Sequence, residues 1–514
     1  MKIKSLLFIA ACTILFSCSN KVPHSNHIPD NASVYGVINT PNIISKVAWD
    51  ALLSGDLFDK LGKQGKSMES TMEDFHQSGV DIMENVYFFK SPELEEQDFA
   101  AILKLTDSKM LEDYLNKKGA EVSFVDGVSF GHIDEINYSF KNDVLLLIIS
   151  EDNKGAQTYS QKVLNTDYSK THNENMSTGL QMTHDLVYCM DVAAFMPQQL
   201  EAFNMSDEVF NADNIDGDMM YAYMNFESGK IHGNMAYLFG QNSSKEADKY
   251  NKDNQIEPLI NTAAGEKVLA SASLSFDFKM LLERMNERGL SENVDVMLSP
   301  YNTSMADITS LLSGDFLYLL SGIDSEEQVQ TRMHFDPELL DYYQTEDTVT
   351  VNTISSTLLI GISKQERAQE LLNQFSLFMM DKGGYYEVKL TGGIYVTLQE
   401  GALVLSNDES VLKGIVNKEN LELNEKAKEI ATKGPIHVWA NMKEVSTGWK
   451  KIDPSNEKLM NIIYQNLSEL TLDSDIDSEK VEYNINMMFE DQSKNSLLQI
   501  IELISENKKD LIAA

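Results

Sequence analysis

The chain has 514 residues, 42% of them hydrophobic, and a formal net charge of −37 at pH 7. This length exceeds one ordinary hydrophobic core and predicts roughly two to four domains. So acidic a chain repels nucleic acid and anionic lipid headgroups, which excludes a nucleic-acid-binding protein and a membrane contact through a basic patch.

Residues 1–17 have the features of a bacterial lipoprotein signal peptide. Two lysines form a positive n-region, and the apolar run Leu6–Phe16 is too short to span a bilayer, which takes about 20 residues. Small Ser17 directly precedes Cys18, which fits cleavage at that bond. We therefore expect a mature chain that begins at a lipidated Cys18, with a formal net charge of 40 − 79 = −39 once those lysines are removed.

The positions of the other cysteines argue against an intramolecular disulfide. Cys12 lies in the signal peptide, so Cys189 is the one ordinary thiol and an intramolecular disulfide is not expected. No later segment reaches about 18 apolar residues without a charge, so we expect the lipid to be the membrane attachment. After Cys18, residues 19–31 are polar, contain two prolines and lack periodicity, which predicts a flexible tether over 18–31.

Beyond the tether the sequence resembles itself at an offset of roughly 235 to 257 residues. The clearest pair is Glu227–Phe239 with Asp477–Phe489, at an offset of 477 − 227 = 250, and four further blocks match in the same order. This order predicts an internal duplication into two similar tandem domains, residues 32–262 and 263–514.

Each repeat has the pattern of an α+β domain. Both contain a predicted meander of three strands separated by turn residues, and short links between strands predict antiparallel pairing. Interspersed amphipathic segments predict helices packed on one face of a mainly antiparallel sheet. The predicted meander strands are 121–126, 129–140 and 144–150 in the first repeat and 385–391, 393–398 and 402–406 in the second.

Several short segments resemble a known family. The signal peptide, the strand entry Ile28–Ala32, the segment Ser78–Ile82 before the strand Val86–Phe89, and Leu312–Phe316 before another apolar strand are similar to the Bacteroidetes lipoprotein family classed as domain of unknown function 4836. That family carries no assigned activity, so the resemblance implies a cell-envelope lipoprotein and no particular chemistry. The residues after the lipidated cysteine lack the acidic run that resembles a surface-export signal, so we expect a periplasm-facing location in the outer membrane.

One named catalytic pattern is present, the G-x-S-x-G of Gly127–Gly131. In a hydrolase the serine stands on a strained turn between a strand and a helix. Here the residues after Ser129 alternate as a strand does, so a hairpin is the favoured interpretation and Ser129 is a weak candidate for a nucleophile.

Alternating carboxylates raise a calcium hypothesis. Asp473, Asp475 and Asp477 have the spacing of a calcium loop, but Ser478 stands where an EF-hand loop needs glycine and Asn484 where it needs glutamate. We expect solvated turn carboxylates and keep the three aspartates as weak calcium candidates. An aspartate cluster just before residue 219 has the same interpretation.

Other metals and cofactors are not expected. The nine histidines are scattered, which disfavours zinc or iron. Met219 and Met220 would point to opposite faces of a strand, which favours core filling over copper binding. Cys189 lies in an apolar strand without a neighbouring base, which predicts a buried, inert thiol. No P-loop or dinucleotide fingerprint occurs.

These observations favour a non-enzymatic cell-envelope scaffold or binding protein, held to the membrane by its lipid, with a protein, lipid or other envelope component as ligand. Two alternatives stay open. One is a surface-displayed binder of glycans or another host ligand. Trp439 and Trp449 could form its platform, but Trp439 belongs to a strand that we expect in the core, so it should be buried. The other is a hydrolase that uses Ser129.

Overall fold

The structure is a computed structural model of the chain, and contacts divide it into two compact units. The N-terminal unit comprises 1–45 and 51–195, and the C-terminal unit comprises 46–50 and 196–514. The structure describes residues 24–54, 77–95, 98–195, 215–244, 255–263, 267–287, 290–336, 341–389, 393–418, 425–432, 434–452, 466–477 and 479–503. The predicted signal peptide and Cys18 lie outside the described residues.

The N-terminal unit is built on an antiparallel sheet. Among the described residues its strands lie in the order β8-β1-β2-β3-β7-β6-β5-β4, and each neighbouring pair is antiparallel. Alternating or continuous apolar residues form these strands, as expected for a sheet that faces a core. They are β1 (Val34–Ile38), β2 (Val86–Lys90), β3 (Phe99–Lys104), β4 (Ser123–Val125), β5 (Val128–Ile133), β6 (Ile136–Lys141), β7 (Val144–Ile149) and β8 (Leu186–Asp191).

Helices cover the N-terminal sheet on more than the one predicted face. Leu111 and Leu115 of α4 pack with Leu145 of β7 in one core cluster. The next residue, Leu146, points to the opposite face and is also fully buried, so β7 is covered on both sides. The described helices between residues 24 and 195 are η1 (His24–His27), α2 (Thr40–Ser54), α4 (Ser108–Lys117), α5 (Asn153–Asn165) and α6 (Glu174–Gln181).

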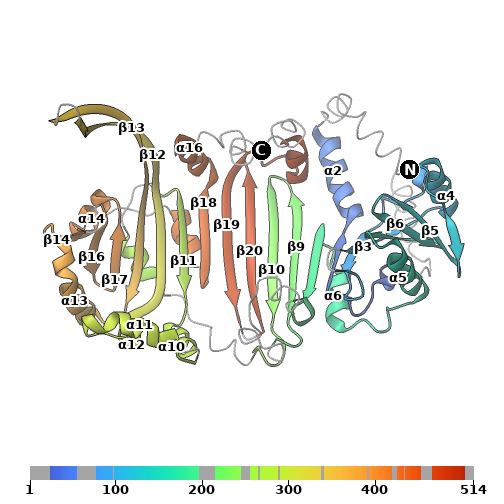
Figure 1. Cartoon of the computed structure of the whole chain (residues 1–514), viewed down its shortest axis with the longest axis horizontal. Helices are drawn as coiled ribbons and strands as arrows, with labels where there is room; N and C mark the ends of the chain where they lie inside the picture. Colours follow the sequence, from blue (N-terminus) through green and yellow to red (C-terminus); the bar gives the residue numbers. More distant parts are fainter. Residues whose placement is uncertain are drawn as a thin grey trace, which may run out of the picture. The chain divides into compact units, whose positions relative to one another are not determined.

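The C-terminal unit contains a wider antiparallel sheet. Its described strands lie in the order β9-β10-β20-β19-β18-β11-β12-β13-β17-β16-β15-β14 (Figure 1). They are β9 (Met219–Glu227), β10 (Lys230–Leu238), β11 (Ala270–Ser275), β12 (Leu312–Asp336), β13 (Asp341–Ile362), β14 (Met379–Asp381), β15 (Tyr386–Val388), β16 (Tyr395–Gln399), β17 (Ala402–Ser406), β18 (Ile436–Asn441), β19 (Leu467–Ile476) and β20 (Lys480–Phe489).

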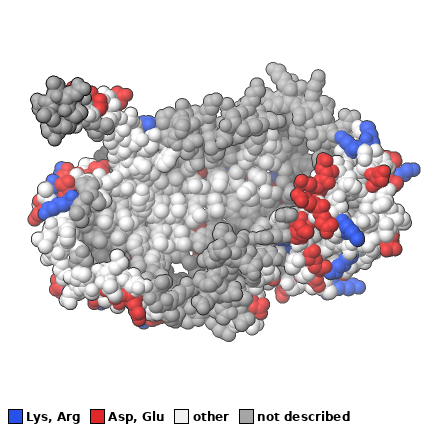
Figure 2. Space-filling view, in the orientation of Figure 1, with Lys and Arg blue, Asp and Glu red and all other residues white. Residues whose placement is uncertain are grey.

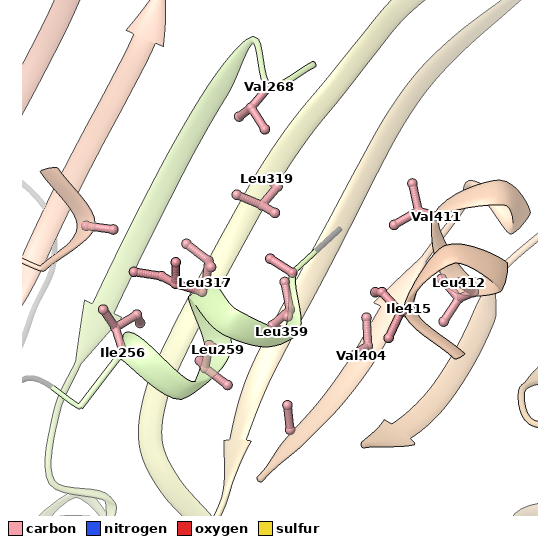
Figure 3. Close-up of a cluster of buried hydrophobic side chains, with 14 of the residues drawn as sticks. Ile256, Leu259, Val268, Leu317, Leu319, Leu359, Val404, Val411, Leu412 and Ile415 are labelled. Atoms are coloured by element: carbon pink, nitrogen blue, oxygen red, sulfur yellow. The ribbon is translucent and has the colours of Figure 1, made fainter. Parts of the chain in front are cut away.

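One face of this sheet holds the main core. Leu317, Leu359 and Val404 are completely buried there, beneath Leu259 of α9 and Leu412 of α14 (Figure 3). The described helices after residue 195 that have named bounds are α9 (Glu257–Thr262), α10 (Phe278–Glu287), α11 (Leu290–Leu298), η3 (Ser299–Tyr301), α12 (Met305–Leu311), α13 (Gln365–Gln374), η4 (Phe375–Phe378), α14 (Glu409–Val416), α15 (Glu425–Ala431) and α16 (Met442–Ile452). Residues 496–503 are also helical.

Two strands are far longer than the rest of the sheet. β12 and β13 pair with one another to the end of β12 at Asp336, whereas β11 accompanies β12 only to Leu320 and β17 accompanies β13 only from Thr357. Figure 1 shows this hairpin running beyond the other strands of the unit. We call its outer part, Ser325–Asp336 with Asp341–Asn352, the arm.

The compact units do not coincide with the predicted repeats 32–262 and 263–514. The hairpin β9–β10, which the sequence placed in the first repeat, belongs to the C-terminal unit. Its strand β10 pairs with β20 along its whole length, from Lys230 with Met488 to Leu238 with Lys480. A local sequence pattern does not report such a pairing between strands about 250 residues apart.

Part of the predicted tether 18–31 is folded. Residues 24–31 belong to the N-terminal unit, because hydrogen bonds join them to residues far along the chain in that unit. The Nε2 of His24 bonds to the carbonyl of Asn85 at 2.6 Å, and the Nε2 of His172 bonds to the carbonyl of Ile28 at 2.8 Å. The segment is polar and lacks periodicity because hydrogen bonds, and not an apolar stripe, hold it to the unit.

The first meander contains one strand more than predicted. The predicted strand 129–140 is divided into β5 and β6 by a tight turn at Asp134 and Glu135, with Asp134 in the left-handed region at φ 52°. Alternating residues continue through this turn, and neither glycine nor proline marks it. The second meander follows the prediction more closely, with β15, β16 and β17 inside or near the expected ranges.

Candidate binding face

One face of the C-terminal sheet carries no charged side chain over eight neighbouring strands, from β9 to the part of β12 and β13 that lies before the arm. A single ladder crosses all of them in register, with residues paired one by one across the sheet. Its members are Met224, Gly233, Ile485, Leu472, Val438, Ala272, Tyr318 and Leu358. Because side chains alternate between faces, the residues two positions away lie on the same face.

We call this surface the uncharged face, and it consists of 28 residues. Figure 2 shows it as white surface over the middle strands of the unit, where few charged atoms are visible. The 28 residues are Met220, Ala222, Met224, Phe226, Ile231, Gly233, Met235, Tyr237, Val481, Tyr483, Ile485, Met487, Leu470, Leu472, Ser474, Ile476, Ile436, Val438, Ala440, Ala270, Ala272, Leu274, Phe316, Tyr318, Leu320, Ser356, Leu358 and Ile360.

The uncharged face is open where the opposite face is closed. Met235, Leu274 and Tyr318 on the uncharged face are 37%, 38% and 40% exposed. On the opposite face Leu317 and Leu359 are completely buried. With strands about 4.8 Å apart, eight strands span about 34 Å. Phe226, Ile231, Ala440 and Ser474 on the uncharged face are buried, and most of its other residues are half-buried. A partly exposed apolar surface of this width marks an interaction site more often than a solvated surface.

Aromatic residues and a helix border the uncharged face at the two ends of β12. At one end the ring of Phe316 stacks on that of Phe276, with 5.6 Å between centroids. At the other end Ile323 is buried beneath α16, and a Cβ at Gly448 would lie only 2.5 Å from the Cβ of Ile323. Glycine at 448 therefore permits a close approach of helix and strand, and it fixes α16 at this end of the face.

The opposite face of the middle strands carries a polar network. Asn234 pairs directly with Asn484 across β10 and β20, and its Nδ2 donates to the Oδ1 of Asn484 at 2.9 Å and to the Oε1 of Glu482 at 2.5 Å. The Nδ2 of Asn484 donates to the Oδ2 of Asp473 at 3.2 Å. These groups bond to one another, so the network joins β10, β20 and β19.

Within the network, Lys480 neutralises the charge of Glu482. A hydrogen bond from Lys480 holds the pKa of Glu482 below its ordinary value, and the same bond raises the pKa of Lys480. Burial, assisted by the charge of Glu482, raises the pKa of Tyr223. None of these directions produces a base or a nucleophile poised near neutral pH, so the network is suited to holding strands together.

The three calcium candidates have different surroundings. Asp473 accepts from Asn484 in the network, whereas the Oδ1 of Asp477 accepts from the backbone N–H groups of Glu479 and Lys480 in the turn before β20. Asp475 lies opposite Glu482. Among the described residues no group of three or more histidine, cysteine, aspartate or glutamate side chains is placed to hold a metal ion.

The aspartate cluster before residue 219 has a capping role at Asp218. That carboxylate is completely buried and accepts from the hydroxyl of Tyr237 at 2.5 Å and the backbone N–H of Gly240 at 2.6 Å. It therefore fastens the chain ends that flank the hairpin β9–β10.

Ser129 lies inside strand β5, paired with Phe124 and Phe140. Gly127 forms the turn before it, at φ 82°, and the chain continues as a strand to Ile133. The strand–turn–helix geometry that a nucleophilic serine needs is therefore missing at this position.

Two predictions about buried residues are confirmed. Cys189 is completely buried in β8, and burial raises the pKa of its thiol to about 12. Such a thiol carries no thiolate at neutral pH and is inert. Trp439, 4% exposed, belongs to the main core cluster of the C-terminal unit, so it forms no open platform for a sugar.

Comparison with known proteins gives little further information. No protein-family model and no curated protein matches the chain. Solved structures of a protein designated TP0453 have low similarity. Its crystal form III is 10% identical with a TM-score of 0.28, covering 47% of this chain and 87% of that one. Its crystal form I is 9% identical with a TM-score of 0.28, covering 47% and 85%. No described helix is both long and apolar enough to traverse a bilayer.

Proposed function

We propose that the protein is a non-enzymatic, lipid-anchored binding protein of the cell envelope, and that its uncharged face takes the acyl chains of a lipid. The observation that carries this proposal is the absence of any charged side chain from the 28 residues of that face, in a chain with a formal net charge of −37. So large an uncharged area is selected against on an acidic surface unless it meets an apolar partner.

Acyl chains fit the chemistry of this face better than a polar ligand. Its polar groups are a few hydroxyls, those of Tyr237, Tyr318, Tyr483, Ser356 and Ser474. A glycan needs planar hydrogen-bonding groups such as carboxylates and amides, and those lie in the polar network on the other face. A hydrocarbon chain requires only contact area, and each CH₂ removed from water contributes about 0.8 kcal/mol.

Displacement of Nile red by a soluble short-chain phosphatidylcholine tests this proposal on the mature protein. The variant M235Q/L274Q places two amides on the uncharged face and should weaken binding of both compounds about tenfold or more. The control V296Q/L377Q removes two more exposed apolar side chains, 72% and 81% exposed, from elsewhere in the unit and should bind as the parent does.

Equal binding by M235Q/L274Q and the parent would overturn the proposal. So would failure of phosphatidylcholine to displace the dye. If instead the parent is a dimer in analytical ultracentrifugation and M235Q/L274Q is a monomer, the face is an interface between copies and not a lipid site.

We further propose that the chain arose by internal duplication. The support is the order of strands, because β8-β1-β2-β3-β7-β6-β5-β4 has the same sequence of connections as β18-β11-β12-β13-β17-β16-β15-β14. Registers match as well. The ladder of Tyr188, Gly36, Phe88, Ala101, Leu147 and Tyr138 corresponds pair by pair to that of Val438, Ala272, Tyr318, Leu358, Leu405 and Val396.

The pairing of β10 with β20 also supports an internal duplication. At the offset of 250 the counterpart of Asn234 is Asn484, and these two residues pair with each other. A local twofold relation between the two hairpins would produce this pairing of a residue with its own counterpart.

Membership of the Bacteroidetes family and a periplasm-facing place in the outer membrane remain part of the proposal. Both depend on the resemblance and on the residues around Cys18. Protease added to intact cells tests the orientation, since a periplasmic protein is cleaved only after the outer membrane is opened. Cleavage on intact cells would favour the surface-displayed alternative.

A further inference from the structure

The arm extends beyond the last contacts that hold its base. Lys451 of α16 forms an ion pair with Asp324 at 2.7 Å, and Asn352 donates to the carbonyl of Ile452 at 3.4 Å. Past this point the two strands continue for 12 paired positions, from Ser325 with Asn352 to Asp336 with Asp341. At about 3.3 Å per residue this is a length of about 40 Å.

No third strand pairs with the arm among the described residues. An isolated two-stranded hairpin is marginally stable in water, because it has backbone groups at both edges and no core on either face. Two apolar side chains of the arm are likewise in solvent. Val329 and Met333 lie on the same face of β12 and are 66% and 59% exposed.

The arm is also acidic. Residues 325–336 and 341–352 contain six aspartates and glutamates and one arginine, a formal net charge of 1 − 6 = −5. Glu327 and Glu346 lie on the same face as Val329 and Met333, to judge by their register across the two strands. These two glutamates therefore share one face with apolar side chains, and the exposed Glu326 lies on the opposite face, so carboxylates flank both open edges of the arm.

We propose that the arm binds a separate protein that adds a β-strand to one of its edges and presents basic side chains to its carboxylates. Strand addition supplies backbone hydrogen bonds, and side-chain charge supplies the preference between partners. A second copy of this chain would bring a second net charge of −5 against the first, and anionic headgroups would be repelled in the same way. The chemistry of the arm therefore selects a cationic strand with alternating apolar residues.

A labelled short peptide of alternating lysine and valine tests this proposal by fluorescence anisotropy on the mature protein. The peptide should bind, and raising the salt concentration from about 0.05 M to about 0.5 M should weaken binding about tenfold. The same peptide with alternate amides N-methylated keeps its charge but cannot pair as a strand, and it should bind about tenfold more weakly or worse.

Variants place the site on the arm. E326K/E346K reverses two exposed charges of the arm and should abolish the binding. The control E292K/E121K makes the same change in net charge at exposed glutamates outside the arm and should bind like the parent. M235Q/L274Q should also bind like the parent, which separates this inference from the proposed lipid site.

Equal binding by E326K/E346K, or equal binding of the N-methylated peptide, would overturn the proposal. Self-association of the parent that E326K/E346K enhances would also overturn it, because the arm would then join copies of the chain.

Discussion

Single histidines fasten the first described residues to the N-terminal unit. His24 is buried, bonds to the carbonyl of Asn85, and meets the ring of Tyr87 edge-on, with centroids 4.9 Å apart. Nearby, His27 bonds through Nδ1 to the carbonyl of Thr166 at 3.0 Å. Sequence reasoning missed these roles, because scattered histidines were weighed only as metal ligands. Each histidine bonds to a carbonyl far along the chain, so no local sequence pattern predicts the bond.

The burial of His24 predicts an effect of pH. Burial lowers the pKa of His24 from its ordinary value of 6.5, although its hydrogen bond to Asn85 opposes this. The unfolded state therefore binds the proton more readily. The contribution of His24 to stability is complete above about pH 6.5 and is lost as the pH falls through the lower pKa of the folded state.

The amide of Tyr168, which donates to the carbonyl of Asn26 at 2.8 Å, provides the measurement. Its protection factor, the ratio of the intrinsic to the observed exchange rate, should fall more between pH 7.5 and pH 5.5 in the parent than in H24Q, which keeps an amide donor without a titrating group. Division by the intrinsic rate removes the pH dependence of exchange itself. An equal fall of the protection factor in the two proteins would contradict the assignment to His24.

At the scale of elements, the meanders and their flanking helices could be predicted from sequence. Helix α4 begins after Asp107, whose side chain accepts from the N–H of Lys109, and such capping residues are visible in a sequence. The pairing of β10 with β20 could not be predicted, because alternation specifies a strand but not its neighbour. The uncharged face was missed for the same reason, since it exists only once eight strands are placed in order.

Asn234 tests how strongly β10 and β20 depend on their polar network. The variant N234A removes the donor to the Oδ1 of Asn484 and to the Oε1 of Glu482 in a half-buried place, whereas the bond from Lys480 to Glu482 remains. We expect the free energy of unfolding of the C-terminal unit to fall by about 1–3 kcal/mol. Urea denaturation followed by tryptophan fluorescence measures this change, because Trp439, one of the three tryptophans, is buried in the same unit. M235A, on the same strand but 37% exposed, is the control and should cost less. A loss no larger in N234A than in M235A would show that the network adds nothing to stability.

At the scale of the whole molecule, the proposed lipid anchor and the two proposed binding surfaces would have complementary roles. The lipid at Cys18 would hold the chain at the membrane, the acidic surface would keep it from anionic headgroups, and two distinct surfaces of the C-terminal unit would meet different partners. The uncharged face is wide and without hydrogen-bonding specificity, whereas the arm is narrow and charged. A protein that places a lipid beside a second protein needs both kinds of surface, and neither requires a catalytic group.

Anchoring through Cys18 is the step on which this arrangement depends. In C18A the lipid cannot be attached, and we expect the protein to leave the detergent phase of a Triton X-114 partition for the aqueous phase. The control C189A changes the buried thiol and should stay in the detergent phase, with the intact mass of a lipidated chain that lacks residues 1–17. Because each variant removes one cysteine, a general loss of thiols cannot explain a difference between them. Partition of C18A into detergent, by a chain whose intact mass shows that residues 1–17 are gone, would refute the lipid anchor, and the membrane attachment would then have to reside in the folded units.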